Sequence, residues 1–339
     1  MRKSSFKDIF LCLFIVFLFF AFAEIGLRFV KFGVNKFGGY FRFGCFQWAA
    51  DKYKVPIERQ DPCLFWRCQE GNIFRGKEYP LVKSENTFRV ICLGDSTTQG
   101  YMMQPMVIAY DQTYPYYLEK ILKNHSPSVN FEVINAGCGG YSSFQGVQYL
   151  KIELLRLNPD LLIVWFGQND LRSAIMYRDA QQRMLNNKLQ QLESFFNRSR
   201  FYQFYRQALF YISSLFSKDK RRVSPEEFYN NLKEMQMLAQ SRGARVIFIT
   251  PVSKLNSRIV SLEDEGLADY LKAFYDLRKE DAAVLDLASF FKQKAEGAKY
   301  FFDYCHPNPE GNRLIAESIY SALVDNRILQ RGKSEISKN

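Results

Sequence analysis

From residue 87 onward, short apolar runs alternate with longer helical patterns, and this alternation constrains the fold more than any other feature of the sequence. The apolar runs, which are rich in β-branched residues, cover residues 88–93, 131–134, 161–166, 245–250 and 283–287. Runs this short and this continuous are typical of strands that are covered on both faces. Helices are expected over residues 114–123, 144–157, 183–238, 262–279 and 309–324. Strands that alternate with helices indicate a parallel sheet with helices on both sides.

The N-terminus carries a second strong pattern. Basic residues precede an unbroken apolar run over residues 9–23, and apolar residues resume over 25–30. Glu24 and Arg28 lie four positions apart, so they can pair on one helix face. A helix needs about 20 apolar residues to cross a bilayer. We therefore expect a basic cytoplasmic leader at 1–7 and a transmembrane signal anchor at 8–30, with the rest of the chain exported.

A cleaved signal peptide is the alternative for the same segment. Ala21 and Ala23 fit a signal-peptidase A-x-A site, and cleavage there would release the protein. The apolar pattern continues past Ala23, however, and basic residues follow it. This favours an uncleaved, single-pass anchor with a periplasmic or cell-surface domain.

The rest of the chain divides by composition. Residues 31–85 have no clear period and are expected to form a connector or cap, residues 86–330 one domain, and residues 331–339 a polar tail. Within that domain, the segment 171–243 is longer than a single connection between two parallel strands needs, which indicates a helical insertion. Its aromatic and basic residues alternate, which suits either a helical layer with aromatics in its core or a basic-aromatic surface on anionic lipid. We favour the helical layer, with its cations in solvent.

Composition narrows the chemistry. Only two of the 339 residues are histidines, which excludes a His-rich metal site, and we expect neither metal nor cofactor. The net charge of +11 does not indicate nucleic-acid binding, because an exported domain meets no genome. Export permits disulfides. Cys63 and Cys68 are near enough in the sequence to close a small loop. Cys138 and Cys305 both lie in loops and could form a disulfide, although separate thiols are favoured there. Cys92 is expected to be a buried thiol.

Two short motifs combine the groups needed for nucleophilic catalysis. Ser96 follows the first strand in a Gly-Asp-Ser turn, at the edge where parallel sheets bind ligands. A serine hydroxyl is a weak nucleophile unless a base accepts its proton. His306 lies just before the last helix, three residues after Asp303, a spacing that lets the carboxylate orient the imidazole. The other histidine, His125, follows a helix end and is expected at the surface.

Two further loops offer hydrogen-bond donors. Asn169 follows the third strand in the sequence Gly-Gln-Asn-Asp, and its amide could stabilise an oxyanion. Gly139 and Gly140 follow the second strand, where glycine permits a close backbone approach. The neighbouring Asp95 and Asp170 are expected to hold their loops through hydrogen bonds to the backbone.

These four blocks, in this order, resemble the SGNH (GDSL-type) hydrolase family over about residues 87–324. The resemblance implies a three-layer α/β/α sandwich, flavodoxin-like, with a five-stranded parallel sheet. It places the nucleophile on Ser96, the other triad members on Asp303 and His306, and the oxyanion donors on Ser96, Gly140 and Asn169. Gly139 stays open as an alternative to Gly140. Thr97 replaces the familiar leucine, and the similarity is greatest to bacterial membrane-anchored members.

The resemblance implies a serine esterase that hydrolyses acyl esters, O-acetyl first among them, on an extracytoplasmic carbohydrate. The same triad would serve a polysaccharide O-acyltransferase or a lipase or lysophospholipase, and a catalytically silent binding module is the alternative from another class. Phosphate or nucleotide binding at residues 94–100 is disfavoured, because this loop lacks both the Walker lysine and the G-x-G-x-x-G spacing.

Overall fold

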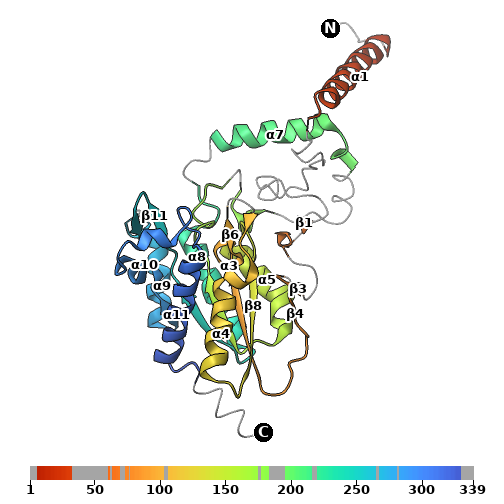
Figure 1. Cartoon of the computed structure of the whole chain (residues 1–339). Coiled ribbons are helices and arrows are strands. Elements are labelled where there is room, and N and C mark those ends of the chain that lie inside the picture. Colours follow the sequence, from red (N-terminus) through yellow and green to blue (C-terminus); the bar gives the residue numbers. More distant parts are fainter. Residues whose placement is uncertain are drawn as a thin grey trace. The chain divides into compact units, whose positions relative to one another are not determined.

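The computed structural model describes residues 6–32, 60–61, 63–68, 73–75, 77–102, 106–174, 177–182, 195–215, 220–264, 267–280 and 282–329 (Figure 1). The chain divides into two compact units. We call Met1–Trp66, Ala174–Tyr177 and Gln181–Lys220 the anchor unit, and Arg67–Ser173, Arg178–Ala180 and Arg221–Asn339 the sheet unit. Most of the expected connector, part of the basic leader and the polar tail lie outside the described residues.

The sheet unit is built on a five-stranded parallel sheet with the order β13-β10-β9-β5-β8. The strands are β5 (Thr87–Gly94), β8 (Asn130–Gly137), β9 (Leu161–Trp165), β10 (Arg245–Ile249) and β13 (Ala283–Leu285). Every residue of β5 and β9 is buried, which explains why their sequences lack the polar–apolar alternation of a half-exposed strand. Arg89 of β5 is buried as well, and its Nε donates to Glu132 at 2.7 Å. The predicted fold class is therefore confirmed, and each expected strand is present.

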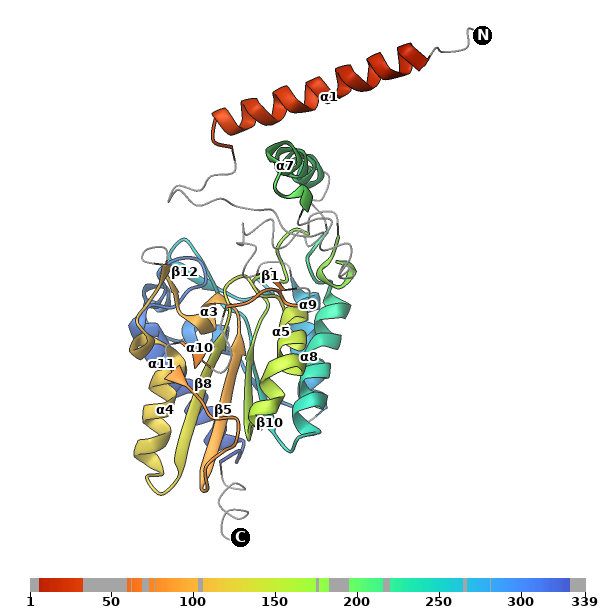
Figure 2. The same cartoon turned by 90° about the vertical axis from the view of Figure 1, so that its right-hand side faces the viewer.

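Helices cover both faces of this sheet, so the unit has three layers (Figure 2). One face carries α4 (Tyr114–His125), α10 (Leu287–Lys292) and α11 (Pro309–Asp325), and the other carries α5 (Ser143–Tyr149), α8 (Pro225–Gln240) and α9 (Ala268–Lys279). Within the first layer, α11 is joined to α4 because the Tyr114 N–H donates to Asn312 Oδ1 at 3.2 Å. The helix α8 falls within residues 171–243, but it packs against α5, α9 and β10 as part of the layer.

The largest departure is in the helical stretch expected over 183–238. Residues 183–194 and 216–219 of this stretch lie outside the described residues, and the rest contains two separate helices, Arg200–Leu215 and Pro225–Gln240. The other departures are short. The helix expected over 144–157 continues beyond α5 as a π-helix (Leu150–Leu154) and a 3-10 helix (Leu155–Leu157), and it ends at Asn158 with a left-handed backbone. Small hairpins were not expected: β3 (Ile73–Phe74) with β4 (Lys77–Glu78), β6 (Tyr101–Met102) with β7 (Met106–Val107), and β11 (Ser253–Leu255) with β12 (Arg258–Val260). Strands of two or three residues are too short to produce a periodic pattern.

The anchor unit contains α1 (Phe6–Phe29), the hairpin β1 (Gln60–Asp61) with β2 (Phe65–Trp66), and α7 (Arg200–Leu215). α1 has 24 residues, none of them buried, and at 1.5 Å per residue it is about 36 Å long. It is the one helix among the described residues that is long and apolar enough to cross a membrane, a property that N-terminal signal sequences share. In α7 the aromatic residues Phe204 and Tyr205 are exposed and Arg200 and Arg206 are buried, which is the reverse of the expected layer.

Candidate active site

The turn after β5 holds Ser96 at the start of a short helix, α3 (Ser96–Gln99). Asp95 caps this helix, because its Oδ1 accepts hydrogen bonds from the N–H and the hydroxyl of Thr97, both at 2.8 Å. Gly94 is required here because a Cβ would collide with the Thr98 side chain. Ser96 is partly exposed, and its N–H donates to no atom of the described residues. The turn therefore presents both the Ser96 hydroxyl and the Ser96 amide.

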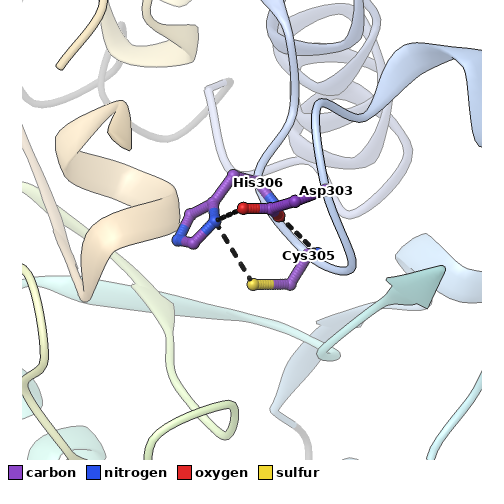
Figure 3. Close-up of side chains that lie close together, drawn as sticks. All are labelled: Asp303, Cys305 and His306. Atoms are coloured by element: carbon purple, nitrogen blue, oxygen red, sulfur yellow. Dashed lines mark hydrogen bonds and ion pairs between the residues drawn. The ribbon is translucent and has the colours of Figure 1, made fainter. Parts of the chain in front are cut away.

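The imidazole of His306 joins this hydroxyl to a carboxylate. Ser96 Oγ lies 2.8 Å from His306 Nε2, and His306 Nδ1 lies 2.7 Å from Asp303 Oδ2. Asp303 Oδ1 is held in turn by the N–H groups of Cys305 and His306, at 3.0 and 2.9 Å (Figure 3). The His306 ring is buried and lies 4.6 Å from the ring of Tyr101. The structure thus brings together the serine, histidine and aspartate named from the sequence.

The other histidine lies elsewhere. His125 is exposed at the end of α4, where its Nδ1 is 2.9 Å from the Ile121 carbonyl. This agrees with the surface position expected for it.

Asp303 is electrostatically suited to orient an imidazole. Burial opposes its ionisation, but hydrogen bonds from the His306 ring and from the N–H groups of Cys305 and His306 outweigh burial and lower the pKa of Asp303 to about 2. The carboxylate is therefore charged at all pH values near neutrality. The fixed negative charge of the carboxylate, 2.7 Å from His306 Nδ1, stabilises the imidazolium that forms when Nε2 takes a proton.

The loop after β8 distinguishes the two candidate glycines. The Gly139 N–H donates to Gln99 Oε1 at 3.0 Å, whereas the Gly140 N–H has no acceptor among the described residues. A Cβ on Gly139 would lie 3.9 Å from Ser96 Cβ, so this loop lies directly beside the nucleophile turn. Gly140 has φ +82°, a conformation that favours glycine. The geometry therefore leaves Gly140 as the available amide.

Asn169 lies beside the same turn, but its amide is already engaged. Its Nδ2 donates to Asp95 Oδ2 at 3.2 Å and to the Tyr141 carbonyl at 3.1 Å, and the residue is buried. An oxyanion would have to share or replace one of these acceptors. Exchange of the Tyr141 carbonyl for an oxyanion is favourable, because a hydrogen bond to a charged acceptor is stronger than one to a neutral carbonyl.

A buried ion pair that the sequence did not indicate holds the Gly140 loop. Arg222 donates to the Gly140 carbonyl at 2.7 Å and to Asp179 Oδ2 at 2.6 Å, and Ser142 Oγ donates to the same Asp179 oxygen at 2.6 Å. The side chains of Arg222 and Asp179 are 3% and 0% exposed. The expectation that the cations of residues 171–243 are solvated is thus wrong for Arg222, because a guanidinium is tolerated inside a protein when its donors are paired.

Asp170 fixes the neighbouring loop, as expected. Its Oδ1 accepts from the N–H of Ser143 at 2.9 Å and from the Ser143 hydroxyl at 2.5 Å, while its buried Oδ2 has no partner within the described part of the chain. Burial is the main reason that the pKa of Asp170 is raised to about 7; the hydrogen bonds from Ser143 act against it. Asp170 therefore titrates near neutral pH.

The cysteine expectations need a correction. Cys138, which was expected to remain a separate thiol, forms a disulfide with Cys68, with Cα atoms 5.5 Å apart. Cys63 takes no part in this bond, and Cys305 and the buried Cys92 are free thiols. Sequence proximity misled the interpretation of Cys63 and Cys68, because disulfide pairing depends on Cα separation in the fold.

Asp303, Cys305 and His306 place their potential metal-ligand atoms within 4.8 Å of one another (Figure 3). Cys305 Sγ is 3.7 Å from His306 Nδ1. Burial raises the pKa of Cys305, which favours the neutral thiol over the thiolate that binds metals. The other two residues already bond to each other and to Ser96, so this group suits proton transfer better than metal binding.

A serine, a histidine and an aspartate in one hydrogen-bonded array, at the carboxyl edge of a parallel sheet, are groups that can transfer an acyl group through the serine. The model of the GDSL-like lipase/acylhydrolase family matches residues 92–314, so the chain belongs to this family. The matched range includes Ser96, Gly140, Asn169 and the loop with Asp303 and His306.

Solved structures with a similar chain path include a lipase/acylhydrolase from Enterococcus faecalis, with 20% identity, coverage of 70% of this chain and 95% of that chain, and a TM-score of 0.46. Another is an acetylxylan esterase from Geobacillus stearothermophilus, with 16% identity, coverage of 70% and 94%, and a TM-score of 0.47. No curated protein matches the sequence.

Proposed function

We propose that the protein is a serine esterase in which Ser96 is the nucleophile, His306 the general base and Asp303 the group that orients His306. The observation that carries the proposal is the continuous hydrogen-bonded array from Ser96 Oγ through His306 to Asp303, with contacts of 2.8 and 2.7 Å. The N–H groups of Ser96 and Gly140 and the amide of Asn169 are the proposed oxyanion donors.

The chemistry follows from this array. As Ser96 Oγ attacks the ester carbonyl carbon, His306 Nε2 accepts the hydroxyl proton, and the carbonyl oxygen becomes an oxyanion that the three donors stabilise. The carbon–oxygen bond to the alcohol then breaks, and His306 returns the proton to the departing alcohol. Water attacks the resulting acyl-enzyme and gives its proton to His306. Finally the acid is released and Ser96 recovers a proton.

The proposed substrate is an O-acyl, most simply O-acetyl, ester on an extracytoplasmic carbohydrate. The disulfide supports an oxidising compartment outside the cytoplasm. Tyr304, whose ring lies 6.1 Å from the His306 ring and is 42% exposed, offers an aromatic surface beside the site against which a sugar ring could pack.

The proposed location is the outer face of a membrane, with α1 retained as a single-pass anchor. Retention is supported by contacts within the anchor unit, because the ring of Phe20 packs 4.9 Å from that of Phe201. Cleavage after Ala23 would remove Phe20 and this contact. Intact mass of the mature protein tests the proposal, and loss of the first 23 residues would disprove it.

Ser96→Ala tests the catalytic assignment directly. The variant should lose ester turnover and reaction with a fluorophosphonate probe but keep the circular dichroism spectrum of the wild type. Ser241→Ala, at the exposed end of α8, is the matched control and should retain both activities. Undiminished turnover by Ser96→Ala would refute the assignment. Acetylated glycans and longer acyl esters, each assayed with and without a glycan acceptor, would then define substrate and acyl acceptor.

A further inference from the structure

The helix α7 is amphipathic with its two faces reversed relative to a soluble protein. Its apolar residues recur at 204, 208, 212 and 215, a spacing that places them on one side of a helix. The large members of this apolar face are exposed by 46% to 53%: Phe204, Tyr205, Ile212 and Leu215. On the opposite side, Gln203 and Arg206 are 1% and 4% exposed. Contiguous exposed apolar side chains of this size mark a surface that binds a partner or a membrane.

Polar contacts attach the start of α7 to the end of α1. The carboxylate of Glu24 accepts from the Phe201 N–H and from the Ser199 hydroxyl, both at 2.8 Å. Arg28 donates to the same carboxylate at 2.7 Å and to the Arg198 carbonyl at 3.2 Å. Glu24 thus caps the first turn of α7, where a negative charge is favourable because backbone N–H groups lack partners there.

Aromatic contacts strengthen this junction. The Phe201 ring lies 4.9 Å from the ring of Phe20 and 6.4 Å from that of Phe19, and Phe204 lies 5.7 Å from Phe32. In both views α7 lies next to the C-terminal end of α1 and runs across its direction (Figures 1 and 2). The depth of α7 in a membrane is therefore set by α1.

The junction places α7 at the membrane boundary. Glu24 and Arg28 are the first charged residues after the apolar run, so they mark the point where α1 leaves the hydrocarbon. Phe20, which packs on Phe201, precedes Glu24 by four residues, or about 6 Å of helix. Amphipathic helices that lie in a membrane interface bury their apolar faces about 5–10 Å into the headgroup and acyl boundary. The two depths agree.

We propose that α7 is an interfacial helix whose apolar face inserts into the outer leaflet of the bilayer that α1 crosses. The inference rests on the proposed anchor and adds a second, in-plane attachment to it. Residues 200–215 include two arginines and no acidic residue, so no negative charge on α7 opposes anionic headgroups. The bilayer is favoured over a protein partner because α1, which fixes the position of α7, is apolar without interruption over residues 9–23 and has no buried residue.

The test uses full-length protein in vesicles of phosphatidylcholine and phosphatidylglycerol, with brominated acyl chains as quenchers. A genetically encoded environment-sensitive fluorescent amino acid replaces Ile212 on the apolar face or, as the matched control, the exposed Gln207, roughly 140° around the same helix. A third variant carries the probe at Ile15 in α1. Hydrolysis of a soluble ester by each variant reports on the catalytic domain independently.

The proposal expects bromine near the headgroups to reduce probe fluorescence at 212 more than at 207, and bromine deep in the chains to reduce it at 15. Quenching at 15 without quenching at 212 would overturn the interfacial helix and leave the anchor intact. A blue-shifted but unquenched probe at 212 would show that protein, here another part or another copy of this chain, covers the face, and it would also overturn the proposal. Absence of quenching at 15 and 212 together would overturn anchor and interfacial helix alike, whereas loss of ester hydrolysis concerns only the esterase.

Discussion

Removal of the Cys68–Cys138 disulfide should strongly destabilise the sheet unit. The bond joins residues 70 apart, and the loop that it closes contains β5, the Ser96 turn, α4 and β8. In the chain-entropy model, a loop of about 70 residues restricts the unfolded chain by roughly 15 cal/mol/K, or about 4 kcal/mol at 25 °C. For a domain of this size each kcal/mol corresponds to about 2–4 °C in the midpoint of thermal unfolding, so we expect a fall of roughly 10 °C.

The measurement compares thermal unfolding of the full-length wild type with the double variant Cys68→Ser and Cys138→Ser, in the same detergent. Cys63→Ser is the matched control, because Cys63 lies five residues before Cys68 but takes no part in the disulfide, so this change should leave the midpoint unchanged. Adding a reductant to the wild type should lower its midpoint toward that of the double variant. A midpoint within about 2 °C of the wild type would refute the entropic reasoning.

Activity well below the unfolding midpoint gives a second readout. The Gly140 loop keeps three other attachments: Cys138 N–H to the Gly94 carbonyl at 3.0 Å, Gly139 N–H to Gln99, and Arg222 to the Gly140 carbonyl. We therefore expect kcat of the double variant to stay within about tenfold of the wild type, less than the roughly 10²–10³ loss on removing an oxyanion donor. A loss of that larger size would show that the disulfide itself holds the donor in place.

Three further predictions concern charged groups in the site. The pKa of Asp170 is raised to about 7, so the folded state holds a proton that the unfolded chain releases near pH 4. The free energy of unfolding should therefore fall as pH rises from about 4 to 7. Asp170→Asn should flatten this slope when stability is measured by urea unfolding, and an unchanged slope would contradict the prediction. Arg222→Lys should lower kcat about 10²-fold with little change in KM, because lysine cannot hold Asp179 and the Gly140 carbonyl together. Its control, Arg221→Lys, should leave both kcat and KM nearly unchanged. Asp303→Asn should reduce kcat about 10⁴-fold. In the wild type the pKa of Asp303 is about 2, so ionisation of Asp303 should produce no step above about pH 4 in the pH–rate profile, and a profile from pH 3 to 8 would check this.

The layered fold could be predicted because its main strands and helices each produce a local pattern of apolar residues in the sequence. The run at 88–93 became β5 and the helix expected at 309–324 became α11, each with small shifts at its ends. Ser96 and His306 could be assigned because serine needs a base, only one of two histidines stood near an aspartate, and parallel strands converge at one edge.

The remaining features depend on contacts between residues far apart in the chain. Arg222 reads as one more cation in a basic segment, and only the fold brings it to Asp179 and to the Gly140 carbonyl, 82 residues away. Cys68 pairs with Cys138, which is 70 residues away in the sequence and comes close to it only through the fold. In α7 the spacing identified a helix, but no local pattern could show that its polar side is buried and its apolar side exposed.

Ser96 and His306 are 210 positions apart in the chain, and this separation also affects when the protein can act during its own biogenesis. In the exported orientation proposed above, the chain leaves the cytoplasm from its N-terminal side, so the serine emerges long before the histidine. The histidine reaches its place only when the loop before α11 closes and α11 docks on α4, where Asn312 accepts from the Tyr114 N–H. In that orientation, a chain exported only as far as residue 302 has its serine but lacks Asp303 and His306, so it has no base to activate Ser96.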